Sequence, residues 1–168
     1  GRFGRPVLPD PTMVEEADYL LVESTYGNRV HDPDDDGERL ATLIRETAAR
    51  GGKMIVPAFA IGRVEELLYW IKRLEEEKRI PILPVFVDSP MALAALSVYR
   101  DAIDGHAVDV RDDLHGDGTL LALPDLDEVL DAEGSKAVSR MSGPAIVIAG
   151  SGMASGGRVV HHLEKFLP

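Results

Sequence analysis

Residues 150–157 form a glycine-rich turn, Gly-Ser-Gly-Met-Ala-Ser-Gly-Gly, between an apolar run and the start of a helical pattern. Glycines at such a junction let backbone N–H groups approach an anion at the positive end of the helix dipole. The turn lacks the Gly-Lys-Ser/Thr of a P-loop and the serine-centred spacing of a nucleophile elbow. A dinucleotide fingerprint nearly fits at Gly150, Gly152 and Ser155, but it lies in the last strand–helix unit and not in the first. The turn therefore predicts an anion site, with a purely structural tight turn as the alternative.

Glu23 is the second candidate for chemistry, because it ends an apolar run that is typical of a strand. A carboxylate at the mouth of a sheet is partly desolvated and can orient a histidine or accept a proton. The alternative is a local cap on neighbouring backbone N–H groups. His161 and His162 are adjacent on an expected helix, so their side chains point about 100° apart and cannot both face one ligand. The other histidines fall in expected loops (His31, His106 and His115), so no convergent zinc ligands are predicted in this chain.

Four short apolar runs are the elements that must position these residues. The runs, at 19–22, 54–56, 85–87 and 145–149, end in small and polar clusters at 23–27, 57–63, 88–90 and 150–157. Because helical patterns follow them, they predict an α/β fold: a Rossmann-like three-layer sandwich with a mainly parallel sheet. Ligands bind outside the carboxyl ends of the strands in such sheets, so the four clusters are expected to converge on one functional edge.

The expected boundaries follow from periodicity and from glycine and proline signals. Strands are expected at 18–23, 53–57, 84–88 and 145–149. Helices are expected at 37–50, 62–79, 90–99, 135–140 and 157–166, with another short one from about 126. Residues 101–124 show weak periodicity and many Asp and Gly, which predicts a loop or a mobile insertion.

The composition limits the class of protein. The 168 residues suit one domain, and the absence of cysteine excludes a disulfide framework and fits a cytoplasmic location. No apolar stretch predicts a membrane helix, and the first six residues look like a loop within a longer chain. The net charge of −11 argues against general affinity for nucleic acid. Much of the acid falls in 32–36 and 101–131, most simply solvated loops, with a cation-binding cluster as the minor alternative.

Four stretches in order carry a family resemblance. They are Ala-Asp-Tyr-Leu-Leu-Val-Glu-Ser-Thr-Tyr-Gly-Asn-Arg at 17–29 with His31; Gly-Gly-Lys at 51–53 leading into Pro-Ala-Phe-Ala-Ile-Gly-Arg at 57–63 with Glu-Glu-Leu-Leu at 65–68; Val-Asp-Ser-Pro-Met-Ala at 87–92; and Ala-Gly-Ser-Gly-Met at 149–153 with Gly-Gly-Arg at 156–158 and His-His-Leu at 161–163. Together they resemble the β-CASP branch of the metallo-β-lactamase superfamily. That branch includes bacterial RNA-processing nucleases and the endonuclease of eukaryotic mRNA 3′-end formation.

The resemblance implies two zinc ions in the full-length protein, held by a His-x-His-x-Asp-His cluster, another His and an Asp on the metallo-β-lactamase domain. These ligand motifs are absent from this chain, so it is expected to hold no zinc itself. The first six residues resemble the tail of the family segment that carries the bridging Asp. Residues 1–17 are therefore expected to be a linker from that domain, and residues 18–168 the β-CASP domain.

The resemblance also implies site residues. The acidic motif after the first β-CASP strand falls on Glu23, which is expected to orient a catalytic histidine from the missing part. The residues expected to contact RNA or its phosphates are Ser24, Thr25, Tyr26, Arg63, Ser151, Gly152, Met153, Ser155, Gly156 and Arg158. Tyr26 and Phe59 are candidates for base stacking, although Phe59 is expected to lie in the core.

Two functions from different classes remain open. The first is the substrate-clamping domain of a zinc-dependent ribonuclease acting on RNA, with single-stranded RNA and its own metallo-β-lactamase domain as partners. The second is a nucleotide- or phosphometabolite-binding Rossmann-like domain without nuclease activity. A His-x-His-x-Asp-His motif upstream supports the first reading, and its absence contradicts it. No membrane association is expected, and a homodimer is left open.

Overall fold

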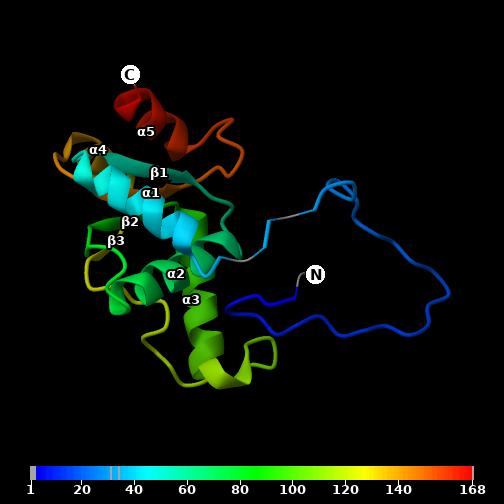
Figure 1. The fold of residues 1–168 in the computed structure, drawn as a ribbon. Coiled ribbons are helices and arrows are strands. Elements are labelled where there is room, and N and C mark those ends of the chain that lie inside the picture. The colour runs from blue at the N-terminus through cyan, green and yellow to red at the C-terminus, as the bar shows by residue number, and fades with distance from the viewer. Residues whose placement is uncertain (1–2, 31, 34, 168) are drawn as a thin grey trace.

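The computed structural model describes residues 3–30, 32–33 and 35–167. Its centre is a four-stranded, all-parallel sheet in the order β1-β4-β2-β3 (Figure 1). The strands are β1 (Lys53–Pro57), β2 (Val85–Asp88), β3 (Leu126–Glu128) and β4 (Ala145–Ala149). The helices are α1 (Glu38–Ala49), α2 (Arg63–Glu76), α3 (Pro90–Asp104), α4 (Ala132–Arg140) and α5 (Arg158–Phe166), with a 3₁₀ turn, η1, at Asp112–Leu114. The α/β fold class is confirmed.

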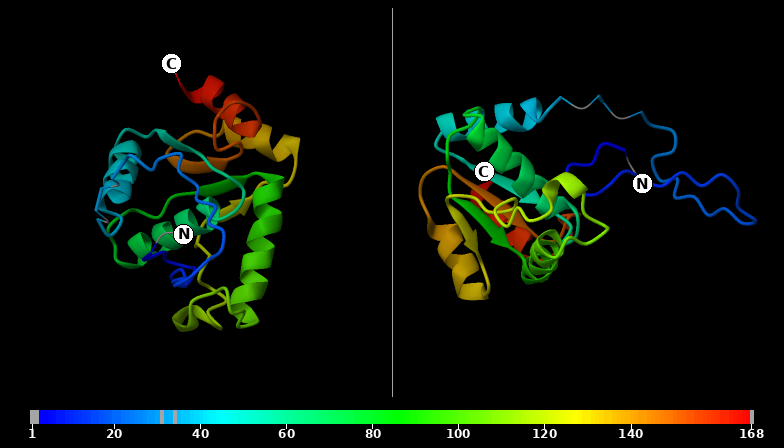
Figure 2. Two further views of the ribbon diagram at one scale, coloured as in Figure 1. Left: turned by 90° about the vertical axis from the view of Figure 1, so that its right-hand side faces the viewer. Right: turned by 90° about the horizontal axis from the view of Figure 1, so that it is seen from below.

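Helices cover both faces of the sheet, as alternating strand side chains require. On one face, Val85, Val87, Ile146 and Ile148 pack in a core with buried residues of α1, α2 and α3. On the other face, Phe86 and Val147 pack with Val138 of α4. Helix α5 contacts β1, β4 and α4, which places it in the second layer (Figure 2). The three-layer sandwich predicted from the sequence is confirmed.

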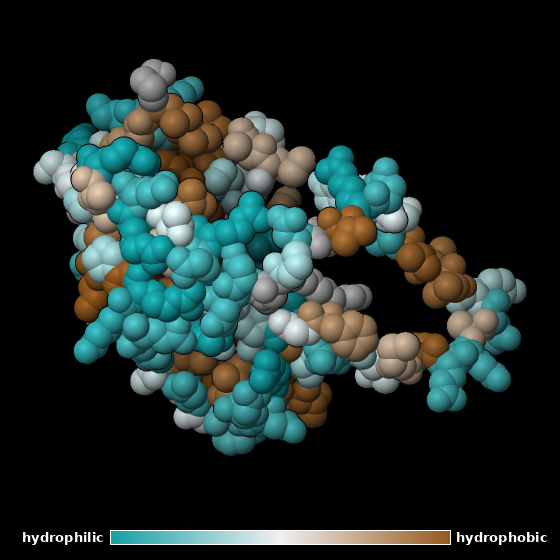
Figure 3. Space-filling view, viewed as in Figure 1, coloured by the Kyte–Doolittle hydropathy of each residue, from teal (hydrophilic) through white to brown (hydrophobic). Residues whose placement is uncertain are grey.

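The predicted strand at 18–23 is wrong. Residues 18–23 have no strand partner in the structure, and their segment runs away from the sheet before α1 begins (Figure 1). Tyr19 and Leu21 are 93% and 99% exposed. Apolar residues remain visible along this segment in the space-filling view (Figure 3). Strand propensity alone does not form a strand, because the backbone groups need a hydrogen-bonded neighbour.

The region 101–131 differs from prediction in two ways. Helix α3 continues to Asp104, and the short helix expected from 126 is the strand β3, which pairs with β2. The connection between them is a loop, as predicted, and it is packed, since Val110, Leu120 and Leu121 are buried. The other helices and strands match their predicted positions within about three residues. Within the described ranges, no helix is long and apolar enough to cross a membrane.

Candidate functional site

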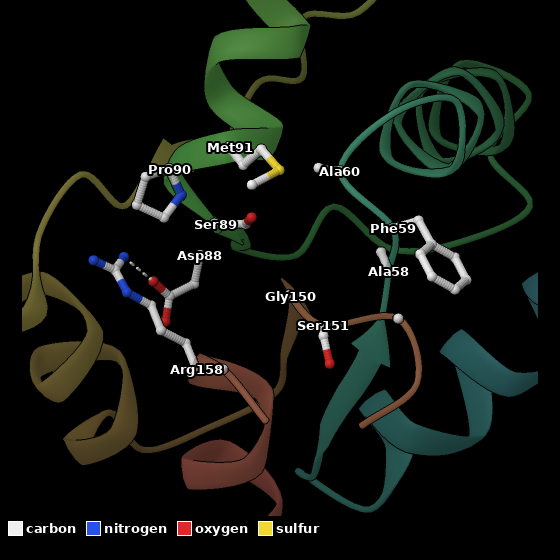
Figure 4. A pocket seen from close by; sticks show the side chains of 12 residues that line it. Ala58, Phe59, Ala60, Asp88, Ser89, Pro90, Met91, Gly150, Ser151 and Arg158 are labelled. Atoms are coloured by element: carbon white, nitrogen blue, oxygen red, sulfur yellow. Dashed lines mark hydrogen bonds and ion pairs between the residues drawn. The ribbon is translucent and has the colours of Figure 1, made fainter. Parts of the chain in front are cut away.

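Three of the four predicted clusters meet in one cavity of about 510 Å³ (Figure 4). The cavity lies at the carboxyl ends of β1, β4 and β2, which are adjacent in the sheet. Its lining comes from the segment after β1, the β2–α3 junction and the turn before α5; these residues are Ala58, Phe59, Ala60, Asp88, Ser89, Pro90, Met91, Gly150, Ser151, Gly152, Gly157 and Arg158. This is the sheet edge where a parallel α/β protein binds its ligand.

The turn at 150–157 packs so closely that two of its glycines leave no space for a side chain. Gly157 has a φ of +75°, and a Cβ added there would lie 2.6 Å from the carbonyl oxygen of Gly150. A Cβ on Gly152 would lie 2.7 Å from the ring of Phe59. The backbone N–H of Val159 donates to Gly150 O at 2.9 Å, which fixes the start of α5. The turn is therefore a tight structural connection that also forms one wall of the cavity.

Asp88, at the end of β2, joins this strand to helices α4 and α5. Its carboxylate is fully buried and accepts hydrogen bonds from Ser135 Oγ of α4 and His162 Nε2 of α5, both at 2.6 Å to Oδ2. Its other oxygen, Oδ1, accepts from Nη1 of Arg158 at 2.6 Å. Burial alone would raise the pKa of Asp88, but the hydrogen bonds from His162, Ser135 and Arg158 outweigh it and hold the pKa below its usual value. Asp88 is therefore a buried carboxylate anion.

The sequence prediction did not select Asp88 or His162 as site residues. The signal was present for Asp88, which ends an apolar run of the sequence in the same way as Glu23 does. His162 carried a weaker signal, because its position on the apolar side of α5 is also that of an ordinary core residue. His162 is fully buried, while the neighbouring His161 lies in solvent, so the prediction that the two rings point apart is confirmed.

The predicted phosphate contacts divide into two groups in the structure. Ser151, Gly152 and Arg158 line the cavity, whereas Met153, Ser155 and Gly156 belong to the same turn but not to the lining. The Arg158 guanidinium is paired with the carboxylate of Asp88.

Arg63 lies outside the cavity lining, at the start of α2. It is 3.7 Å from Glu66, which Arg5 also holds at 2.8 Å. The phosphate contacts of Arg63 and Arg158 stay predictions.

The cluster at 23–27 does not reach the cavity. The prediction that all four clusters converge is therefore wrong for the cluster around Glu23. Residues 23–27 belong to the exposed segment before α1; here Ser24, Thr25 and Tyr26 form a local turn, and Tyr26 lies under the guanidinium of Arg29. Glu23 accepts a hydrogen bond from the Thr25 backbone N–H at 2.7 Å. Hydrogen bonding to Thr25 lowers the pKa of Glu23, so the carboxylate is charged and caps its own turn.

Phe59 corrects another expectation. Its side chain was expected in the core, but it is 58% exposed at the rim of the cavity. The reason is its position one residue past the buried Ala58, where the chain has already left the sheet. His31 lies outside the described residues. Among the residues that are described, no group of three or more His, Cys, Asp or Glu could hold a metal ion.

Comparison with known proteins identifies the family. A family model for the Beta-Casp domain matches residues 64–168. The chain is 37% identical to "Ribonuclease TTHA0252" of Thermus thermophilus over 99% of its own length. The chain belongs to the β-CASP family. This is the branch of the metallo-β-lactamase superfamily that its motifs resemble.

More distant members match as well. A "Transcription termination factor FttA" of Lokiarchaeum is 30% identical over 86% of this chain, and an "Endoribonuclease YSH1" of Kluyveromyces lactis is 29% identical over 92% of it. The chain spans 38% of the Thermus ribonuclease, 23% of the Lokiarchaeum factor and 20% of the yeast endoribonuclease. The β-CASP part is thus shared by relatives whose remaining length differs.

Proposed function

We propose that this chain is the substrate-clamping domain of a zinc-dependent ribonuclease that hydrolyses RNA phosphodiester bonds. The observation that carries the proposal is a cavity at the carboxyl edge of the sheet in a β-CASP chain whose relatives are named ribonucleases. The names of these relatives do not favour the alternative of a nucleotide-binding domain without nuclease activity.

The residues described here do not fit a zinc site, since they offer no cluster of three ligands. In the proposal, zinc is held by a metallo-β-lactamase domain of the longer protein and supplies Lewis-acid chemistry there. This chain contributes the RNA-facing surface. The turn at 150–157 and Arg63 hold the RNA backbone, and contacts of this kind position a strand without reading its sequence.

Glu23 has a separate role in the proposal. Its charged carboxylate orients a histidine of the longer protein. The neighbouring Ser24, Thr25 and Tyr26 bring hydroxyl groups to the RNA at the same place. The support is the position of Glu23 in the family's acidic motif together with its lowered pKa, which keeps the acceptor charged.

The test is hydrolysis of single-stranded RNA by the full-length protein before and after zinc removal with a chelator. We expect activity to disappear with zinc and to return when zinc is added. Glu23→Gln should lower kcat by roughly 100-fold or more, because a neutral amide orients a histidine poorly. Glu16→Gln, in the same exposed segment, is the matched control. Chelator-resistant hydrolysis would contradict the proposal, and unchanged turnover of Glu23→Gln would leave Glu23 as a local cap.

A further inference from the structure

The cavity is lined by one pair of charged side chains, and the two charges offset each other. Among its described lining residues, Arg158 is the sole cation and Asp88 the sole anion. Nη1 of Arg158 donates to Asp88 at 2.6 Å and to the carbonyl oxygen of Val129 at 3.1 Å, which uses both of its hydrogens. Nη2 lies 3.5 Å from the carbonyl oxygen of Leu130. A phosphate entering the cavity would gain little net attraction, because the Asp88 carboxylate already offsets the charge of the Arg158 guanidinium, so the chemistry inside favours a neutral group.

Most of the remaining cavity wall is apolar, and its rim carries two large exposed side chains. Phe59 is 58% exposed on the β1 side, and Met91 is 71% exposed at the start of α3 (Figure 4). The ring of Phe59 lies against Gly152, so it is held from one side. A flat aromatic ligand can contact both an aromatic ring and a polarizable thioether.

Two hydroxyl groups add weak polar recognition. Ser89 Oγ accepts from the backbone N–H of Ala92 at 3.3 Å, and in the described part of the chain its own hydrogen has no acceptor. Ser151 Oγ donates to the carbonyl oxygen of Gly156 at 3.3 Å, which leaves its lone pairs free to accept. One available donor and one available acceptor match the edge groups that every nucleobase carries.

We propose that this cavity binds an unpaired nucleobase of single-stranded RNA, with the Phe59 ring and the Met91 thioether against the base. The inference rests on the proposed function and specifies which part of the RNA enters the cavity: the base is inside and the phosphates stay outside the rim. The volume of about 510 Å³ lies in the range of pockets that enclose a small ligand. Recognition by stacking and by two hydroxyl groups tolerates all four bases but excludes a base that is paired in a duplex.

The test uses the full-length protein and a short single-stranded RNA, with binding measured in chelator so that the strand stays intact. Phe59→Ala should weaken binding roughly 5- to 150-fold, the range for loss of one stacked base, whereas Phe59→Trp should keep the affinity. Phe3→Ala is the control, since Phe3 is 57% exposed and lies outside the cavity. An RNA with one abasic position should bind the wild type as weakly as intact RNA binds Phe59→Ala, with no further loss when both changes are combined.

Two results would overturn the inference. If Phe59→Ala binds and cleaves RNA as the wild type does, the cavity holds no base, although the proposed ribonuclease function stands. If Phe59→Ala and Met91→Ala instead lower the Tm of the RNA-free protein and affect duplex and single-stranded RNA equally, the rim is covered by another part of the protein. An absence of RNA binding and of zinc-dependent hydrolysis in the wild type would contradict the proposed function itself.

Discussion

At the scale of single residues, Glu65 is a carboxyl group that the fold buries without a side-chain partner. It lies in the first turn of α2, is 1% exposed, and neither of its oxygens has a well-aligned hydrogen bond among the described residues, although the backbone N–H groups of Gly62 and of Glu65 itself offset part of the cost of burial. Burial raises its pKa above the ordinary value of 4.5. The folded state therefore keeps a proton that the unfolded chain releases, so stability falls as pH rises from about 4.5 towards the folded pKa.

Glu65→Gln should remove this loss, because an amide has nearly the same shape as the protonated acid and does not titrate. We expect the free energy of unfolding of the variant, measured in denaturant, to equal that of the wild type near pH 4.5 and to exceed it at pH 8. Glu75, whose pKa burial raises to about 7, acts in the same direction, so the double variant should show the flattest pH dependence. The exposed Glu46→Gln is the control, and a steeper decline in Glu65→Gln would contradict the prediction.

Asp88 is the opposite case, a buried carboxylate whose oxygens are both satisfied. Asp88→Ala would leave His162 and Arg158 without their anion inside the fold. Because breaking a buried ion pair from one side costs about 3–5 kcal/mol, we expect a loss of that size in the free energy of unfolding. Asp127→Ala, at an exposed position of β3, should change it by less than about 0.5 kcal/mol. A loss below about 1 kcal/mol at Asp88 would mean that water replaces the lost carboxylate.

At the scale of elements, a further prediction concerns the tight turn that leads into α5. Gly157 and Gly143 both have positive φ values, +75° and +86°, but a Cβ would clash with Gly150 O at Gly157 and meets open space at Gly143. Gly143→Ala should cost about 1–2 kcal/mol of unfolding free energy from backbone strain alone. Gly157→Ala should cost clearly more, since the Gly150 carbonyl must move as well. Equal Tm values for the two variants would show that the Gly150 carbonyl can move at little cost in stability.

The elements also show where sequence information is sufficient. The strands at 53–57, 85–88 and 145–149 were predictable because continuous apolar runs between glycine and proline signals have one stable environment, a parallel sheet covered by helices. The run at 19–22 has the same composition, but a strand also needs a neighbour, which local sequence does not supply. β3 was missed for the reverse reason, since its Leu-Asp-Glu sequence is a poor strand and is held by pairing with β2.

The candidate site, like the fold, could be predicted only in part from the sequence. The glycines before α5 and the segment after β1 pointed to the correct sheet edge. The partner of Arg158 was not predictable, because Asp88 lies 70 residues away and only the β2–β4 pairing brings it close. The exposure of Phe59 also depends on where the chain leaves the sheet, which apolarity alone does not determine.

At the scale of the whole molecule, the net charge of −11 repels RNA at long range, and much of the basic charge is paired internally. Arg79 bridges Glu38 and Glu77, and Arg73 bridges Glu77 and Asp36, which ties α1 to the end of α2. In the proposed function, the contribution of this domain to RNA binding therefore depends on the few cations that remain available in it. Arg63 is one, since its side chain is 55% exposed and its partner Glu66 is held more closely by Arg5.

The salt dependence of binding distinguishes Arg63 from Arg158. Each phosphate contact contributes about 0.7 to the slope of log K against log[salt] for a single strand. We expect Arg63→Ala in the full-length protein to flatten this slope by about 0.7 and to weaken binding equally for all sequences. If the cavity binds a base as proposed, Arg158→Ala should leave the slope unchanged, because its guanidinium already neutralises Asp88, and should instead lower the Tm. The reverse pattern, a flatter slope for Arg158→Ala and none for Arg63→Ala, would mean that RNA displaces Asp88 from Arg158, and the cavity would then bind a phosphate and not a base.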